Sequence, residues 1–342
     1  TLTATDCLVQ ESREVGVYAS ASLATLEGVQ IVDTRPTSAG QFGRGVAMED
    51  HSTLVVTDCL VSGSHDSGLV ASESDVTLES VQVVDTRRNV VGTAAFGLIA
   101  QMGASAVATD LTVDNTDGPS LYATAEAFLG CTDCTLTDNT FAGAAVQGGG
   151  ALVLESTLIE NTSPESNTGG GVGVFVDDRK SETYGPPSLT LLNSTVRDNA
   201  MGAIYIKGMG SIQLTGNELS GGEGYTVNPG IWSHGDAVFV TAGEEVTTAW
   251  DETELVGLLL QGNSLTESSG AGVFLDGAGA TLSGNTYEDN TTDVVRQVCD
   301  DIDAPQGLDD EPTSSTLLCP DYDYRTRDLD LEAYLLETEV EL

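Results

Sequence analysis

Six ionisable residues in the second half of the chain recur a few positions after a glycine that opens a short apolar run. They are Asp177, Asp178, Lys207, His234, Asp236 and Asp276. The glycines are Gly173, Gly202, Gly230 and Gly272. Two carboxylates about 6.5–9.5 Å apart can hydrolyse a glycosidic bond with inversion. Carboxylates can instead hold Ca²⁺ beside a base, as β-elimination of a polysaccharide requires. The competing interpretation is a polar outer strand face that carries one Lys and one His.

An internal repeat sets the positions of these residues. Leu26–Arg35 recurs as Leu78–Arg87, an offset of 52 residues. Each copy divides again, because Cys7, Val29 and Cys59 occupy equal places at spacings of 22 and 30 residues. Longer spacings fit the same 22-residue unit with an inserted loop. The chain therefore contains about eleven units.

Each unit has two recurrent strand patterns. One is a glycine followed by an alternating apolar run, such as Gly68–Ala71, and the other is a short strand with a polar corner, such as Leu158–Thr162. Period-two alternation puts every second side chain inside, and Asn tolerates the left-handed conformation of a corner. The expected corner or ladder residues are Asn139, Asn161, Asn199 and Asn290. We expect Asn139 and Asn161, one rung apart, to bond along such a ladder.

This repeat resembles the right-handed parallel β-helix proteins of the pectate-lyase-like superfamily. The resemblance covers roughly residues 1–295. It implies an all-β fold, a right-handed parallel β-helix or β-solenoid of about eleven rungs, followed by an acidic C-terminal segment at 296–342. The superfamily includes lyases, hydrolases, epimerases and adhesins, so the resemblance leaves the activity open.

Four segments are similar to the motifs of polygalacturonases in that superfamily. Asn115–Gly118 is similar to their Asn-Thr-Asp-Gly, Asp177–Asp178 to their paired Asp, Ser233–Gly235 to their Gly-His-Gly, and Tyr205–Lys207 to their Arg-Ile-Lys. In that family the four lie on nearby rungs and the Lys follows the His. Here Asn115 lies more than two rungs before Asp177, and Lys207 precedes His234. This order favours the polar strand face.

The charge balance excludes several classes of partner. The chain has 53 acidic and 12 basic residues, a net charge of −41. Such a charge repels nucleic acid and anionic membrane surfaces, and no run of about 18 apolar residues predicts membrane insertion. It suits a protein dispersed in salt or one that collects cations such as Ca²⁺. No motif requires a cofactor, and Asp300–Asp303 lacks the spacing of a calcium loop, so a metal site stays unknown.

The chain has six cysteines. Cys299 and Cys319 bracket an acidic loop, and we expect a disulfide between them, which indicates an oxidising compartment. Cys131 and Cys134 form a CxxC without a βαβ pattern, so a thioredoxin-type role is not expected and their pairing stays open. Cys7 and Cys59 lie two rungs, about 10 Å, apart, too far for a disulfide. Together with Cys134 they are expected to be small buried hydrophobic residues.

The two ends of the chain differ. The chain opens in the middle of the repeat, so we expect a leader and earlier rungs to be missing, and an open first rung invites stacking on a partner. At the other end, residues 326–342 are expected to form an amphipathic element over the last rung. Its apolar residues are Leu329, Leu331, Tyr334, Leu335 and Leu336.

These features favour a secreted or cell-surface β-solenoid with a structural or adhesive role. Its strand face would bind a polysaccharide, a cell-surface glycan or cations. The first alternative is a polysaccharide lyase or glycoside hydrolase centred on Asp177, Asp178, Lys207, His234 and Asp236. The second is a subunit of an extracellular homo-oligomer or filament.

Overall fold

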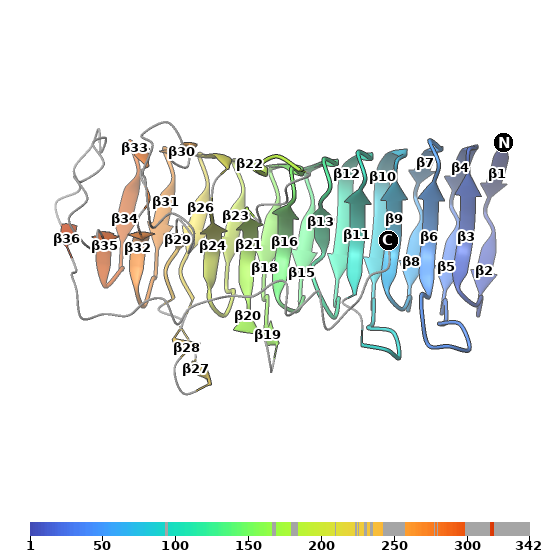
Figure 1. Cartoon of the computed structure of the whole chain (residues 1–342), viewed down its shortest axis with the longest axis horizontal. Helices are drawn as coiled ribbons and strands as arrows, with labels where there is room; N and C mark the ends of the chain where they lie inside the picture. Colours follow the sequence, from blue (N-terminus) through green and yellow to red (C-terminus); the bar gives the residue numbers. More distant parts are fainter. Residues whose placement is uncertain are drawn as a thin grey trace.

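The computed structural model is a right-handed parallel β-helix whose strands stack along one long axis (Figure 1). The structure describes residues 1–92, 95–165, 169–178, 184–208, 210–222, 224, 226–228, 231–232, 235–241, 257–276, 278, 280–297 and 315–317. Each rung contributes one strand to each of three walls, and all pairings within the walls are parallel. The fold expected from the repeat is therefore confirmed.

The first and second walls are joined through two ten-residue strands that cross the corner between them. The first wall contains β1 (Leu2–Thr5), β4 (Leu23–Glu27), β7 (Thr53–Thr57), the first parts of β10 (Asp75–Val84) and β12 (Ser105–Asp114), β14 (Phe128–Thr132), β17 (Ala151–Glu155), β22 (Ser188–Leu192), β25 (Ser211–Thr215), β30 (Gly257–Gln261) and β33 (Thr281–Ser283). The second wall contains β2 (Leu8–Gln10), β5 (Gln30–Val32), β8 (Leu60–Ser62), the second parts of β10 and β12, β15 (Thr135–Thr137), β18 (Leu158–Glu160), β23 (Thr195–Arg197), β26 (Glu218–Ser220), β31 (Ser264–Thr266) and β34 (Thr286–Glu288).

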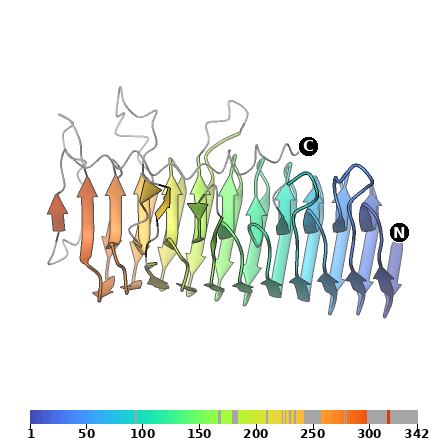
Figure 2. The same cartoon turned by 90° about the horizontal axis from the view of Figure 1, so that it is seen from below.

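The third wall has twelve strands in the part of the chain that the structure describes. They are β3 (Val15–Ser20), β6 (Arg44–Glu49), β9 (Ser67–Ser72), β11 (Phe96–Gln101), β13 (Leu121–Ala123), β16 (Ala142–Gln147), β21 (Val172–Asp177), β24 (Gly202–Lys207), β29 (Val238–Thr241), β32 (Ala271–Asp276), β35 (Thr292–Gln297) and β36 (Ser315–Leu317). Two antiparallel hairpins lie outside the walls: β19 (Pro164–Glu165) with β20 (Gly169–Gly170), and β27 (Thr226–Asn228) with β28 (Ile231–Trp232). Figure 2 shows the helix from below.

The interior is filled by every second side chain of each wall. Leu189 and Leu191 of β22 are fully buried, as are Val174 and Val176 of β21. The glycines that open the third-wall strands are required by packing. A Cβ on Gly68 would lie 2.3 Å from Cγ1 of Val83 and 2.6 Å from the carbonyl oxygen of Gly97. A side chain there would therefore collide with the interior and with the next rung.

The corner between the first and second walls is stabilised by one column of inward side chains. Cys59 Sγ accepts the N–H of Val29 at 3.3 Å, and Ser194 Oγ accepts the N–H of Thr157 at 3.0 Å. In the last rungs Asn217 and Asn263 occupy the same column. The residue before each ladder side chain takes the left-handed conformation, as Asp58 does with φ 52°. A polar side chain thus satisfies backbone N–H groups that the turn leaves without a strand partner.

Three of the four asparagines expected to form a ladder do so, and the fourth, Asn161, lies in the neighbouring corner column. Asn139 and Asn199 are buried and accept the N–H groups of Thr116 and Thr162 at 3.2 and 3.0 Å. Asn290 accepts the N–H of Ser268 at 3.1 Å in the same way. Asn161 is an exposed corner residue with φ 59°, so it does not stack on Asn139 as expected. Thr162 is the residue in register with Asn139, because Thr140 pairs with Ser163.

The cysteines correct one further expectation. Cys59 is buried, but Cys134 is joined to Cys131 by a disulfide, so it is not a free hydrophobic residue. Cys7 is exposed, because it lies in the first rung and nothing in the described chain stacks on its outer side. Cys299, Cys319 and the expected cap at 326–342 lie outside the described residues. The third wall continues past the expected boundary at residue 295, since β35 ends at Gln297 and pairs with β36.

Candidate functional site

Two of the candidate residues meet on the outer face of the third wall. Asp177 ends β21 and is in register with Lys207, which ends β24. The row continues through Gln147 on one side and Thr241 on the other. Asp177 is only 2% exposed, and both Asp177 and Lys207 are engaged in interactions. Opposite charges directly opposite each other on neighbouring strands stabilise the sheet.

The other candidates lie close to this row or outside the described residues. The N–H of Asp178 donates to the carbonyl oxygen of Lys207 at 2.8 Å, which fixes its backbone beside the pair. The backbone of Asp276 continues the row, because Asp276 is in register with Thr241. His234 lies outside the described residues.

Asp236 lies at the opposite end of the same strands. It precedes β29 and adjoins Gly202, the first residue of β24. Lys207 is the last residue of β24, five residues after Gly202, which is a distance of about 16 Å along an extended strand. A single sugar unit cannot contact both ends, so Asp236 does not share one subsite with Asp177 and Lys207.

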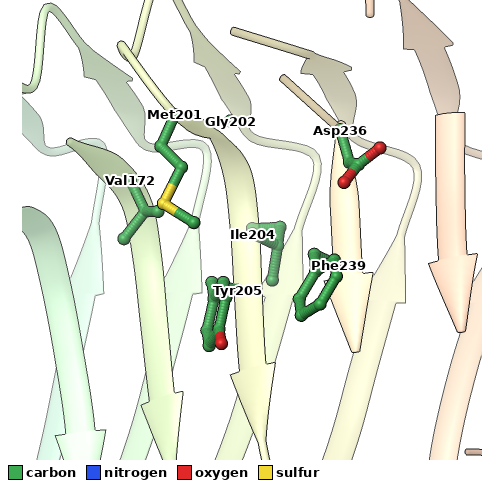
Figure 3. A pocket seen from close by; sticks show the side chains of 7 residues that line it. All are labelled: Val172, Met201, Gly202, Ile204, Tyr205, Asp236 and Phe239. Carbon is green, nitrogen blue, oxygen red and sulfur yellow. The ribbon is translucent and has the colours of Figure 1, made fainter. Parts of the chain in front are cut away.

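The carboxyl group of Asp236 is enclosed. It is 5% exposed, and its Oδ1 accepts the N–H of Ala271 at 2.7 Å. Burial raises the pKa of Asp236 to about 7, and the hydrogen bond from Ala271 opposes this rise. Figure 3 shows the adjoining pocket, which is lined by Met201, Tyr205 and Phe239 among others. The pocket has room for about one water molecule and is too small for a sugar.

The Asn115–Gly118 segment has a structural role at another corner. Arg87 Nη1 donates to Oδ1 of Asn115 at 3.2 Å, and the same guanidinium lies 3.5 Å from Asp117. Asn115 itself has φ 58°. These contacts tie neighbouring rungs together where the chain turns from the second wall to the third. The resemblance of this segment to a catalytic motif is explained by turn chemistry.

An aromatic column is the main feature that the sequence pattern did not reveal. Phe175, Tyr205, Phe239 and Phe274 stack on the outer face of the third wall with ring centroids 5.4, 4.9 and 5.2 Å apart. All four rings are 5% exposed or less. The signal in the sequence was an aromatic residue between two aliphatic residues in four rungs, as in Val174–Val176. Such a run equally fits a strand that is buried on both faces.

The first wall carries a second group of outward apolar residues, and these are exposed. Leu23, Val55, Val107 and Phe128 are 50%, 38%, 44% and 38% exposed. Cε1 and Cζ of Phe128 lie 3.2 and 3.3 Å from the place where a Cβ of Gly130 would stand, so the ring lies over Gly130. A larger residue at position 130 would displace it. Exposed apolar groups that gather on one face are typical of interaction sites.

Metal and membrane sites were sought in the same part of the chain. Among the described residues no group of three or more His, Cys, Asp or Glu side chains is placed to hold a metal ion. The acidic segment around Asp300–Asp303 lies outside those residues. No helix in the described part has the length and apolar character needed to cross a membrane.

The sequence matches one family model, described as the right-handed beta helix region, over residues 2–185 and 84–240. The chain belongs to the right-handed β-helix family. No curated protein matches this β-helix.

Solved structures similar to this β-helix include three GH87 α-1,3-glucanase domains. A catalytic domain in complex with tetrasaccharides has a TM-score of 0.45 at 11% identity, over 92% of this chain and 62% of its own. A second, in complex with nigerose, has a TM-score of 0.47 at 9% identity, over 92% and 63%. The thermostable catalytic unit from Streptomyces thermodiastaticus strain HF3-3 has 0.39 at 15%, over 91% and 61%. This β-helix spans about three fifths of each of these domains.

Proposed function

We propose that this β-helix is a rigid structural and adhesive module of the cell surface or extracellular space that binds a linear glycan along the outer face of its first wall. The observation that carries the proposal is the exposed apolar strip on this face, formed by Leu23, Val55, Val107 and Phe128. The strip extends over five rungs spaced about 4.8 Å apart. Leu23 and Phe128 occupy one outward column, four rungs apart, and Val55 and Val107 occupy the next column, two rungs apart. A rigid stack of this kind presents an extended binding surface.

The chemistry of the face suits a carbohydrate. The ring of Phe128 lies over Gly130 and leaves a flat apolar surface open to solvent. Hydroxyl groups flank it, because Thr109 and Thr132 are in register on the neighbouring column. A sugar ring has apolar C–H faces and a polar rim, so a ring platform beside hydroxyl groups matches both.

The net charge selects among glycans. The protein carries a net charge of −41, and exposed carboxylates such as Glu79 and Asp75 lie on the first wall itself. Long-range repulsion disfavours an anionic polymer. The expected ligand is therefore a neutral or amino-sugar polysaccharide.

A binding role fits the positions of the ionisable residues better than catalysis does. The Asp177–Lys207 pair and Asp236 lie at opposite ends of the third-wall strands. Asp236 opens onto a pocket of about one water molecule. Asp177 and Asp178 therefore lie too far from Asp236 for the two ends to act as a carboxylate pair on one glycosidic bond.

The test is binding to a panel of neutral, amino-sugar and acidic polysaccharides, followed by calorimetry on the best ligand. We expect Phe128→Ala to weaken binding at least about tenfold, the effect of losing an aromatic anchor of ~1.4 kcal/mol. The matched control is Val90→Ala, which removes an apolar side chain that is 81% exposed on a loop. Absence of binding to every polysaccharide, or equal losses in both variants, would refute the proposal. Release of shorter sugars from any member of the panel would favour an enzyme instead.

A further inference from the structure

The first wall ends in a row of exposed carboxylates, here called the carboxylate row, beside the apolar strip. In each of the first seven rungs the strand ends either in Thr followed by Asp or in Glu followed by an uncharged residue. The register aligns these ends, because Glu27 pairs with Thr57, Thr57 with Glu79, and Thr132 with Glu155. Each rung therefore contributes one carboxylate. The members are Asp6, Glu27, Asp58, Glu79, Asp110, Asp133 and Glu155.

Turn chemistry explains only part of the carboxylate row. Its Asp members have positive φ, such as 52° at Asp58, a conformation that Asp tolerates at a corner. Where Gly28 or Ser80 occupies the corner, the carboxylate stands one residue earlier, on Glu27 or Glu79. The side chain of a Glu at a strand end takes no part in the turn. Because either position supplies the carboxylate, the charge itself is the common property of these rungs.

The carboxylate row has no counter-charge within the described part of the chain. The strands of the first wall contain no Lys, Arg or His. None of the row carboxylates forms an ion pair there, in contrast to Glu11 and Asp85 at the next corner, which pair with arginines. Neighbouring rungs lie about 4.8 Å apart, and like charges at that spacing repel. A polymer with positive charges that lies along the row would relieve this repulsion.

The carboxylate row and the apolar strip occupy the same rungs. The strip begins at Leu23 and ends at Phe128, and the row extends one rung beyond it at each end. The four later rungs of this wall carry no carboxylate at this edge. Their strand ends and corners are Leu192–Asn193, Thr215–Gly216, Gln261–Gly262 and Ser283–Gly284. In a chain with 53 acidic residues, composition alone does not explain why the row stops where the strip does.

A sugar chain that lies on the strip also reaches the row. Two residues along a strand are about 7 Å apart, and this distance separates outward Val107 from Thr109 on β12. Thr109 is in register with Glu79 of the neighbouring rung. A sugar ring that packs on Val107 can therefore place a ring substituent over the row. A protonated amine is the complementary substituent, because it carries a positive charge and donates three hydrogen bonds.

We propose that the first wall binds a polysaccharide of amino sugars with free amino groups, whose ring faces pack on the apolar strip and whose protonated amines pair with the carboxylate row. The proposal rests on the glycan-binding function proposed above and narrows its ligand to a cationic polymer. Neutral and N-acetylated glycans supply the ring faces but no charge. One carboxylate per rung suits one amine per sugar, because a sugar unit in an extended chain is about as long as the rung spacing.

Titration calorimetry of the full chain with three hexamers tests the proposal. The hexamers are those of glucosamine, of N-acetylglucosamine and of lysine. The buffer is held at about pH 5.5, where amines are protonated and ordinary carboxylates are ionised, and it contains a chelator that removes divalent cations. The glucosamine hexamer should bind at least about tenfold more tightly than either of the others, a difference of ~1.4 kcal/mol, because it alone combines ring faces with charge.

Two matched triple variants separate the row from the overall charge of the protein. The row variant combines Glu27→Gln, Glu79→Gln and Glu155→Gln. The control combines Glu73→Gln, Glu267→Gln and Glu288→Gln, three exposed glutamates outside the first wall. Both variants change the net charge equally, and both should melt like the wild type because the replaced side chains are exposed. The row variant should bind the glucosamine hexamer at least about tenfold more weakly, whereas the control should bind it as tightly as the wild type.

Equal affinity for the two sugar hexamers would overturn the cationic ligand, and so would unchanged binding by the row variant. Glycan binding itself would survive both results if Phe128→Ala still weakened it. Equal losses in the row and control variants would show that long-range charge attracts the amine, which also overturns the role of the row. Tighter binding of the lysine hexamer would identify a basic peptide as the ligand instead. Failure of both sugar hexamers and of every polysaccharide to bind would refute the glycan-binding function together with this inference.

Discussion

Asn263 is the residue whose replacement tests the corner ladder most directly. Its Oδ1 accepts the backbone N–H and the side-chain Nδ2–H of Asn217 at 3.0 and 2.9 Å. Its Nδ2 donates to the carbonyl oxygen of Leu214 at 2.9 Å and to Oδ1 of Asn285 at 3.0 Å. The side chain is 1% exposed. One amide therefore satisfies polar groups of three successive rungs where water has no access.

The expected cost of Asn263→Ala follows from these contacts. Four hydrogen bonds are lost, and each contributes about 1 kcal/mol net to folding, so the free energy of unfolding should fall by ~4 kcal/mol. Asn263→Ser should lose about half as much, because a hydroxyl can accept the N–H of the rung before, as Ser194 does from Thr157. The control is Gln213→Ala, which removes an exposed amide from the neighbouring strand β25 and should change stability by less than ~0.5 kcal/mol.

Urea denaturation followed by the circular dichroism of the strands measures these differences. Similar slopes of the unfolding free energy against urea would show that the variants unfold over the same surface. The reasoning about the ladder fails if Asn263→Ala loses less than ~1 kcal/mol, below the value of even one or two buried hydrogen bonds. It also fails if Gln213→Ala loses as much.

Other consequences concern a buried acid, a ring and a disulfide. Burial raises the pKa of Asp236 to about 7 in the folded protein, above its value in an unfolded chain. Between about pH 4 and 7 the folded protein therefore keeps a proton that the unfolded chain releases. The free energy of unfolding should fall as the pH rises through this range. Relative to the variant Asp236→Asn, the free energy of unfolding of the wild type should fall by on the order of 4 kcal/mol over that pH range. Parallel curves of unfolding free energy against pH for the two proteins would contradict this. Phe175→Ala should lower the free energy of unfolding by ~3–5 kcal/mol because the ring is fully buried, whereas Phe128→Ala should lower it far less in the same melts. Equal losses would show that the aromatic column around Phe175 is not packed. The Cys131–Cys134 disulfide closes a loop of only four residues, so its reduction should lower the free energy of unfolding by no more than ~2 kcal/mol. Thiol titration during denaturation monitors the reduction. Unfolding of the protein on reduction would refute that estimate.

The repeat predicted the fold because one local rule is used in every rung. Alternation in runs such as Gly68–Ala71 decides which side chains face inward, and stacking equal rungs is the way to bury them all. Spacing alone did not distinguish the ladder position, which Asn139 occupies, from the corner position, which Asn161 occupies. In each rung the corner residue immediately precedes the ladder residue, and only the side chain of the ladder residue turns inward.

The candidate site shows the same division. The sequence placed Asp177 and Lys207 on one face, because both end a third-wall strand, and the register brought them directly opposite each other. Asp236 looked equivalent in the sequence, yet it precedes its strand and lies about 16 Å away along the wall. Distance along the chain does not report which end of a strand a residue occupies when the preceding loop changes in length.

The sequence by itself determined the parallel stack of rungs, its interior side chains and the glycines at the strand starts, because these depend on a period that every rung repeats. The tertiary structure alone decided what the outward side chains face. The same alternation that buries Val174 and Val176 turns Phe175 outward, and no local pattern distinguishes a covered wall from a bare one. Burial of Phe175 and exposure of Val107 and Phe128 depend on contacts between residues far apart in the chain, which periodicity does not encode.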